Sequence, residues 1–161
     1  MLRLANSSDS AAIAAIYNHY ALHTAVNFDH QALAPEAMDQ RMARVWEAEL
    51  PWLVVEENQQ LLGYACGSPW IAQSRYPYSA ESTIYLAPGQ VGRGLGRTLY
   101  QGLLAALATR RIHSVIGGIT LPNAASVALH EKLGFQKVAH LREVGFKFGQ
   151  WIDVGYWQLL L

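Results

Sequence analysis

Apolar residues in the first third of the chain recur with the spacings of one strand and two helices. A short alternation over residues 2–4 predicts a strand, and residues 11–22 carry an apolar stripe with helical spacing. The polar residues 6–9 precede that stripe and can cap the helix. After a loop over residues 23–34, Pro35 fits the first position of a second helix. The apolar side of this second helix is expected to hold Met38, Met42, Val45 and Trp46.

The middle of the chain contains short apolar runs that predict strands. Residues 52–55 and 61–66 are two of them, and the polar residues 57–60 between them predict a hairpin turn, which makes the two strands antiparallel. A third run, residues 84–86, is stopped by a Pro-Gly pair. The segment 68–79 before it is irregular and rich in aromatic residues. It is expected either to form the wall of a small-ligand pocket or to cover the core as a hydrophobic lid.

Helix and strand patterns alternate in the last part of the chain, which closes with a hairpin. Residues 113–120 predict a strand, and Asn123 is the expected N-cap of a helix that Gly134 ends. Residues 135–148 and 151–160 are two long β segments that form the terminal hairpin. The expected buried stripes are Leu95, Leu99, Leu103, Ala106 and Leu107 in the helix before the strand, and Ala125, Leu129 and Leu133 in the helix after it.

This order of elements predicts an α/β fold. Residues 1–161 are expected to form a single domain with one mixed, mostly antiparallel central sheet, helices on its faces and a C-terminal β-hairpin. The chain has 161 residues, of which 52% are apolar and 15% are charged, so it is long and apolar enough to bury a core. That composition excludes an intrinsically disordered protein.

Charge and composition narrow the partners and the compartment. Twelve basic and twelve acidic residues cancel, so neither nucleic acid nor a membrane surface is an expected partner. The apolar runs are shorter than the roughly 18 residues of a membrane-spanning helix, and the first residues lack the apolar core of a signal peptide. The single cysteine, Cys66, fits a reducing compartment, so we expect a cytoplasmic protein. The histidines lack the spacing of metal ligands, and no metal is expected.

The most informative stretch is the glycine-rich turn between the strand at 84–86 and the helix that begins at Leu95. Gly92, Gly94 and Gly96 allow a tight turn and expose backbone N–H groups in front of the positive end of a helix, which suits a phosphate or pyrophosphate. The spacing gives neither the dinucleotide fingerprint nor a P-loop. Similar turns also occur without a ligand, so the glycines alone identify none.

Four segments, together with this turn, resemble the GNAT superfamily of acyl-CoA-dependent N-acetyltransferases, and in particular its branch of phosphinothricin and methionine sulfoximine or sulfone N-acetyltransferases. The segments are Ala15-Ile16-Tyr17-Asn18, Glu81-Ser82-Thr83-Ile84-Tyr85-Leu86, residues 124–135, and Leu141-Arg142-Glu143-Val144-Gly145-Phe146-Lys147-Phe148-Gly149-Gln150-Trp151-Ile152-Asp153. The last motif is long and unusual, which makes the branch assignment more specific than the glycines. The resemblance implies a GNAT-type fold, acetyl-CoA as cofactor, a small-molecule amine as substrate, and a homodimer with the terminal hairpin near the partner's site.

The resemblance also implies which residues bind acetyl-CoA. The backbone of the strand at 84–86 is expected to meet the pantetheine arm, and the turn at 91–97 is expected to meet the pyrophosphate. Val91 stands where most members have Arg or Gln, but the contact is mainly through the main chain. Arg93 and Arg97 can pair with phosphate or can form an ordinary solvated face. The expected cofactor-binding residues are Ile84, Tyr85, Leu86, Val91, Gly92, Arg93, Gly94, Leu95, Gly96, Arg97, Asn123 and Lys132.

Two residues are candidates for proton transfer. An amine must lose a proton to attack a thioester, and a thiolate must then leave. Glu81 lies just before the cofactor-binding strand, where the branch places a glutamate general base; its alternative is an unreactive position at a strand edge. GNAT enzymes often pair the leaving thiolate with a tyrosine, and the corresponding residue here is His130. Packing, or a hydrogen bond to a carbonyl, is an equally good interpretation of His130.

The acceptor site is expected to differ from that of the branch. Two arginines that the branch usually has before the central strand appear here as Ile71 and Pro77, and Arg75 or Lys147 can supply a cation instead. A small, amino-acid-like primary amine remains the expected acceptor. The alternatives are acetylation of a protein amine and a non-catalytic acyl-CoA sensor. The expected substrate-binding residues are Phe28, Trp70, Arg75, Tyr76, Tyr78 and Lys147.

Overall fold

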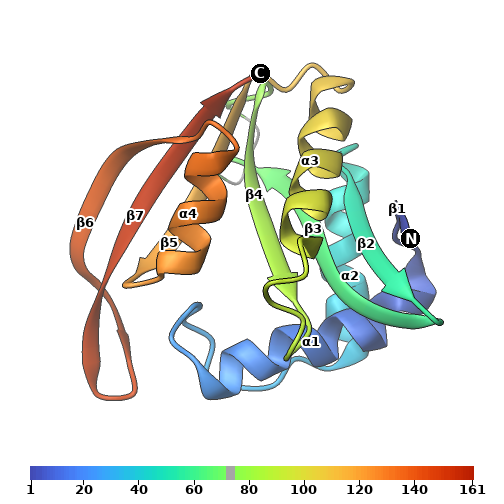
Figure 1. Ribbon diagram of the computed structural model, residues 1–161, viewed down its shortest axis with the longest axis horizontal. Helices are drawn as coiled ribbons and strands as arrows, with labels where there is room; N and C mark the ends of the chain where they lie inside the picture. Colours follow the sequence, from blue (N-terminus) through green and yellow to red (C-terminus); the bar gives the residue numbers. More distant parts are fainter. Residues whose placement is uncertain (72–74) are drawn as a thin grey trace.

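The computed structural model describes residues 1–71 and 75–161. It shows one twisted sheet with helices on both faces (Figure 1), with the strand order β1-β2-β3-β4-β5-β7-β6. In chain order the elements are β1 (Leu2–Leu4), the 3₁₀ helix η1 (Ser7–Asp9), α1 (Ser10–His23), α2 (Pro35–Glu47), β2 (Trp52–Glu57), β3 (Gln60–Pro69), β4 (Ser79–Leu86), α3 (Leu95–Ala108), β5 (Ser114–Leu121), α4 (Ala124–Lys132), β6 (Gln136–Lys147) and β7 (Gln150–Leu160).

The predicted fold class and order of elements are confirmed. Strands β3 and β4 are longer than predicted, because each is paired on both sides and the pairing extends regular backbone beyond the apolar run. The irregular segment predicted over 68–79 is therefore shorter, and its residues 72–74 lie outside the described part of the chain. Within the described residues, no helix is long and apolar enough to cross a membrane.

The core lies between the sheet and the helices on its two faces. Helices α1 and α2 contact β2, β3 and β4 from one side, whereas α3 and α4 cover the other side, the one nearer the viewer in Figure 1. The predicted stripes of α2 and α3 are buried at Met38, Met42, Leu99 and Leu103. The stripe predicted for the helix after β5 is confirmed in part: Leu129 and Leu133 pack against the core, whereas Ala125 is exposed and the fully buried residue of α4 is His130. This helix has only 9 residues, and its packing against β5 decides which side is buried.

Local interactions fix where η1 begins and where α4 ends. Asn6 and Asp9 form a reciprocal capping box at the start of η1, and Arg3 binds the Asp9 carboxylate with two hydrogen bonds of 2.8 Å. Because Arg3 also donates to Glu56 on β2, the first strand, the first helix and the sheet are tied together. At the other end, Gly134 has a φ of 93°, which ends α4 as predicted.

The sheet splits in its centre. Strands β4 and β5 are parallel and pair at only three positions, the last of which joins Glu81 to Ile116. Beyond that pair the two strands diverge (Figure 1), so the β4 edge from residue 82 to residue 86 has no β5 partner. A strand edge with unpaired N–H and C=O groups can bind an extended ligand. The unpaired edge of β4 is therefore the segment that was predicted to meet the pantetheine arm.

Strands β6 and β7 form the predicted terminal hairpin. The register of this pair shifts between Leu141 and Gly145, and Glu143 in the bulge has a φ of 53°, a left-handed conformation that is uncommon outside glycine. The bulged segment stands away from the regular ladder and changes the direction of its side chains.

Candidate active site

Glu81 occupies the last position at which β4 and β5 are paired. Its side chain is half-buried, and burial raises the pKa of its carboxyl group above the ordinary value. Gly118 lies two residues beyond the β5 partner of Glu81, and a Cβ at this glycine would be 3.7 Å from Glu81 Oε1. Gly118 is exposed and has no side chain, so it adds no atoms next to the carboxylate. The predicted base therefore has a raised pKa and a glycine, not a bulky residue, beside it.

An aromatic pair lies next to Gly118. Tyr156 on β7 is opposite Gly118, and a Cβ at the glycine would be 3.2 Å from the Tyr156 ring. Trp70 packs edge-on against Tyr156 with ring centroids 5.9 Å apart. Trp70 was predicted to bind the acceptor, whereas sequence reasoning missed Gly118 and assigned Tyr156 only to the hairpin. Gly118 and Tyr156 are brought together by the pairing of β5 with β7, and the sequence alone does not show which strands pair.

Lys147 has a different role from the predicted one. It is 1% exposed, and its ammonium group donates hydrogen bonds to the backbone carbonyls of Ala21 at 2.7 Å and Asn27 at 2.9 Å. Phe28, from the same loop, packs directly against Gly145 of β6. The lysine therefore fastens the loop after α1 to the terminal hairpin, and its donors are engaged by the protein rather than facing a substrate.

The remaining predicted acceptor residues lie at the surface. Arg75, Tyr76 and Tyr78 are exposed, with Tyr76 at 49% and Tyr78 at 60%. The backbone carbonyl of Tyr78 accepts hydrogen bonds from His113 and Ser114, which fixes the start of β4 against β5. Their predicted contact with the acceptor stays a prediction.

The glycine-rich turn has the geometry that anion binding needs. Gly92 and Gly94 have φ values of 86° and 77°, and a Cβ at either would meet no atom within 4 Å, so the turn is open. Gly94 is also the N-cap of α3, and having no side chain it leaves the N–H groups of the first helical turn uncapped. Gly96 serves packing instead, since a Cβ there would be 3.4 Å from Leu129 of α4. Val91 is 68% exposed at the tip of the turn.

The charged residues of the turn are not equivalent. Arg93 donates to Glu57 of the β2–β3 hairpin at 2.9 Å and to the Gln90 side chain, so it braces the turn against the sheet. The guanidinium group lowers the pKa of the Glu57 carboxyl. Arg97 is an exposed residue of the first turn of α3, where a phosphate would be attracted by its charge and by the helix terminus together.

The end of β4 is held from the side of α1. The Tyr20 hydroxyl donates to the Leu86 carbonyl at 2.7 Å, and the Tyr85 ring packs among Tyr17, Tyr20 and Tyr64. Ile84 lies on the opposite face, toward the core that α3 covers. Side chains thus anchor both faces of β4, while its backbone borders the opening toward β5.

The three predicted site residues at α4, namely Asn123, His130 and Lys132, differ in how far they are buried. The Asn123 side chain accepts from Ser126 N at 3.2 Å and caps the helix, as predicted. Lys132 is exposed in the last turn. His130 is 3% exposed, and both of its ring nitrogens are engaged, Nδ1 by the Ser126 carbonyl at 2.8 Å and Nε2 by the Tyr100 hydroxyl at 2.8 Å. His130 is thus buried and hydrogen-bonded to a carbonyl, which fits the second interpretation given for it, and its predicted role as proton donor to the thiolate stays a prediction.

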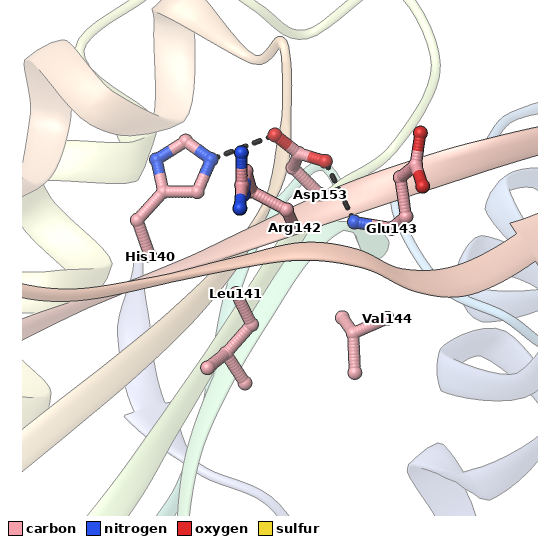
Figure 2. Close-up of a pocket in the computed structure, with 6 residues that line it drawn as sticks. All are labelled: His140, Leu141, Arg142, Glu143, Val144 and Asp153. Carbon is pink, nitrogen blue, oxygen red and sulfur yellow. Dashed lines mark hydrogen bonds and ion pairs between the residues drawn. The ribbon is translucent and has the colours of Figure 1, made fainter.

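A shallow hollow lies on the terminal hairpin, away from Glu81. Its lining is the bulge of β6 together with Asp153 of β7 (Figure 2). Asp153 accepts from His140 Nε2 at 2.7 Å and from the Glu143 amide at 2.8 Å, and these bonds lower the pKa of the carboxyl group. Figure 2 shows Leu141 and Val144 on the other side of the hairpin from these polar groups. In residues 1–71 and 75–161 no group of three or more His, Cys, Asp or Glu side chains is placed to hold a metal ion.

Comparison with known proteins identifies the family of this fold. The family described as "Acetyltransferase (GNAT) domain" matches residues 2–155. Among curated relatives, the phosphinothricin N-acetyltransferase of Streptomyces viridochromogenes is 39% identical over 98% of this chain and 85% of its own length. The L-methionine sulfoximine/L-methionine sulfone acetyltransferase of Salmonella typhimurium is 38% identical over 99% of this chain and 94% of its own length.

Solved structures show the same architecture. The yncA acetyltransferase of Salmonella typhimurium, determined with acetyl-CoA, superposes with a TM-score of 0.97 at 36% identity, covering 100% of this chain and 93% of its own. A phosphinothricin acetyltransferase from Sinorhizobium meliloti, in complex with acetyl-CoA, gives a TM-score of 0.96 at 28% identity, covering 100% and 88%.

Fold and comparisons together define an acetyltransferase. Because the family profile covers almost the whole chain and the relatives share more than a third of its residues, the chain belongs to the GNAT family of N-acetyltransferases. The predicted family and branch are confirmed.

Proposed function

We propose that this enzyme transfers the acetyl group of acetyl-CoA to the primary amine of a small, amino-acid-like acceptor, with Glu81 as general base. The observation that carries the proposal is the position of Glu81, a carboxylate with a raised pKa at the point where β4 and β5 separate, with the exposed Gly118 beside it. The names of the relatives support an acceptor of the phosphinothricin or methionine sulfoximine type.

The donor is bound along the split. The open turn at Gly92 and Gly94 and the uncapped start of α3 bind the pyrophosphate through backbone N–H groups, and Arg97 adds charge. The pantetheine arm extends along the free edge of β4, where it takes the place of a sheet partner between residues 82 and 86. The thioester then lies at the closed end of the split, next to Glu81.

The reaction follows from this placement. Glu81 accepts a proton from the acceptor ammonium group, directly or through one water molecule, and the free amine attacks the thioester carbonyl. A backbone N–H of β4 at the closed end of the split stabilises the oxyanion, and the tetrahedral intermediate collapses with release of the coenzyme A thiolate. Because burial raises its pKa, the Glu81 carboxylate is a stronger base than an exposed glutamate.

The acceptor lies between Glu81 and the aromatic pair Trp70–Tyr156. These rings favour an acceptor with a compact apolar or thioether-like side chain. Ile71 and Pro77 supply no charge, and Lys147 is engaged by backbone carbonyls, so Arg75 is the cation proposed to bind the acceptor carboxylate. An acceptor with a second anionic group, such as a phosphinate, is expected to be used less well than one without it.

The test is a screen of acceptors that follows free thiol release from acetyl-CoA. Methionine sulfoximine, methionine sulfone, phosphinothricin, free amino acids and polyamines are compared, with acetyl-CoA binding measured separately by calorimetry. The proposal requires turnover with at least one amino-acid-like amine. If acetyl-CoA binds and no small amine releases thiol, the proposed acceptor class is refuted in favour of a protein amine or a sensor; if acetyl-CoA does not bind, the donor assignment is refuted.

The proposal also covers the oligomeric state of the protein and its cellular compartment. The hairpin exposes Phe146 at 50% and Trp151 at 65%, with rings 4.8 Å apart, and large exposed apolar groups on one element favour burial against a second copy. We therefore propose a homodimer formed through β6 and β7. Cys66 is a buried free thiol, which supports a reducing cytoplasmic compartment.

A further inference from the structure

A buried chain of hydrogen bonds joins β4, α3 and α4 directly behind Glu81. Ser82 follows Glu81 on β4, so its side chain points to the opposite face of the sheet. Its hydroxyl oxygen is 2.6 Å from the Tyr100 hydroxyl of α3, which is 2.8 Å from His130 Nε2 of α4. Ser82, Tyr100 and His130 are 8%, 0% and 3% exposed. The chain thus lies in the core, at the closed end of the β4–β5 split.

The direction of these hydrogen bonds follows from their last acceptor. His130 Nδ1 is 2.8 Å from the Ser126 carbonyl oxygen, which can only accept, so Nδ1 carries a proton. Burial lowers the pKa of the His130 ring, which is therefore neutral and has no proton on Nε2. Nε2 must then accept from the Tyr100 hydroxyl, whose oxygen accepts from Ser82. Ser82 thus donates to Tyr100, and Tyr100 donates to His130.

A glycine and an aromatic ring pack closely around His130 and fix the position of its imidazole ring. A Cβ at Gly117 of β5 would be 2.5 Å from Nε2, so the ring fits only because this residue is glycine. Phe135 packs edge-on against both rings, with its centroid 5.4 Å from Tyr100 and 5.1 Å from His130. The consecutive glycines of β5 therefore serve opposite faces: Gly117 admits the His130 ring, and Gly118 leaves space beside Glu81.

We propose that Ser82 and Tyr100 are positioning residues that hold His130 as a neutral imidazole with its proton on Nδ1, so that in the resting enzyme His130 accepts a hydrogen bond and does not act as a proton donor. The inference rests on the proposed function, because it concerns the same split. It also changes the role that the family resemblance suggested for His130.

The hydrogen bonds between Ser82, Tyr100 and His130 can also run in the opposite direction. If Nε2 gained a proton, Tyr100 would accept from it and donate to Ser82, and Ser82 would donate to the Ile116 carbonyl, which is 3.3 Å away. A proton that arrives at the Ser82 oxygen reaches Nε2 by this route: the Ser82 proton moves to Tyr100, and the Tyr100 proton moves to His130. A proton held on Nε2 in this reversed state can return toward the split only through Tyr100 and Ser82, so these two hydroxyls control its release.

Nitrogen NMR tests the inference without relying on catalysis. The chain has six histidines, and the spectrum of a His130→Gln variant assigns the His130 signals by their loss. Long-range proton–nitrogen correlation at neutral pH is expected to show a protonated Nδ1 and an unprotonated Nε2. In Tyr100→Phe the Nε2 signal should move toward the position of a nitrogen that accepts no hydrogen bond. A protonated Nε2 in the wild type, or an Nε2 signal unchanged in Tyr100→Phe, overturns the proposal.

Kinetics then tests whether the positioning matters. Tyr100→Phe is expected to lower kcat by about tenfold, the size of one lost hydrogen bond at a reacting site, with the KM for acetyl-CoA unchanged. Ser82→Ala should lower kcat in the same direction and Ser82→Thr, which keeps the hydroxyl, should restore it. If kcat is unchanged in all three variants, the residues only pack and the proposal fails. A wild-type enzyme without acetyl transfer would instead refute the proposed function, and leaves the NMR result to stand alone.

Discussion

At the scale of single residues, the proposed chemistry depends on the surroundings of one carboxylate. Glu81 is partly removed from water, which raises the pKa of its carboxyl group, and no cation within residues 1–71 and 75–161 offsets that rise. Its neighbour across the sheet, Gly118, adds no atoms to the space in which an amine would approach. A carboxylate with a raised pKa and a glycine beside it suits general-base catalysis.

Replacing this base should slow the reaction strongly. We expect Glu81→Gln to lower kcat/KM for the acceptor by roughly 10²–10⁴-fold, the usual contribution of one positioned base, with little change in acetyl-CoA affinity. In the wild type kcat/KM should fall as pH decreases through the folded pKa of Glu81, because the protonated form cannot accept a proton. That decline should lie above the ordinary glutamate range of about 4.3, and it should be absent in the variant. An unchanged pH profile in Glu81→Gln would remove Glu81 from this role.

The space beside Glu81 can be tested by filling it. Gly118→Ala and Gly118→Val should raise the KM for the acceptor in that order, with valine costing roughly tenfold or more because it overpacks against Tyr156. The KM for acetyl-CoA should stay the same, since this glycine faces away from α3 and α4. Equal acceptor KM values for glycine and valine at position 118 would show that the acceptor binds elsewhere.

At the scale of elements, the terminal hairpin and the loop after α1 work as one unit. The hairpin is paired with β5 along the whole length of that strand, and Lys147 and Gly145 fix the loop of residues 24–34 against it. Asn27, which accepts from Lys147 through its backbone, also donates to the Tyr85 hydroxyl at 3.3 Å. Asn27 therefore connects β4, through Tyr85, to the terminal hairpin, through Lys147.

Removing the lysine charge should loosen this unit. Lys147→Met keeps the length of the side chain but leaves the Ala21 and Asn27 carbonyls without their donor, so the free energy of unfolding should fall by about 1.5–3 kcal/mol. Urea unfolding measures this, and Lys132→Met, at an exposed position, is the matched control with little expected change. A stable Lys147→Met variant whose only defect is a raised acceptor KM would instead support a direct contact of Lys147 with substrate.

At the scale of the whole molecule, the polar and apolar surfaces are unevenly distributed. The net charge is zero, so long-range electrostatics contribute little to assembly. Large exposed apolar residues concentrate on the two terminal strands instead: Val138, Leu141, Val144, Phe146 and Trp151. Leu141 and Val144 lie on the other side of the hairpin from Asp153 (Figure 2), whereas Trp151, two residues before Asp153, and its partner Phe146 lie on the Asp153 side, so both faces of the hairpin expose apolar residues. This distribution is the basis for the proposed dimer.

Light scattering with size-exclusion chromatography tests the dimer. We expect twice the 17.8 kDa mass of the chain for the wild type and a shift toward the monomer for Phe146→Ser combined with Trp151→Ser. Leu22→Ser, which replaces another exposed apolar residue, on α1, is the control and should leave the mass unchanged. A wild-type monomer would contradict the proposal, and the hairpin would then need another partner.

The sequence by itself determined the elements, the family and the glycine-rich turn before α3. The stripes of α2 and α3, the Asn123 cap, the Gly134 stop and the glycines at 92 and 94 depend on residues within a few positions of one another, so their spacing shows in the linear chain. The unusual motif at 141–153 identified the branch in the same way.

Only the tertiary structure decided which side chains work together. Gly118 meets Tyr156, Ser82 meets Tyr100 and His130, and Lys147 meets Ala21 because strands and helices far apart in sequence are brought side by side. Each contact joins residues whose separation carries no periodic signal, and each depends on which strand lies next to which. Pairing of non-consecutive strands, and the helices packed on them, therefore fixed the surroundings of Glu81, His130 and Lys147, none of which the linear pattern contains.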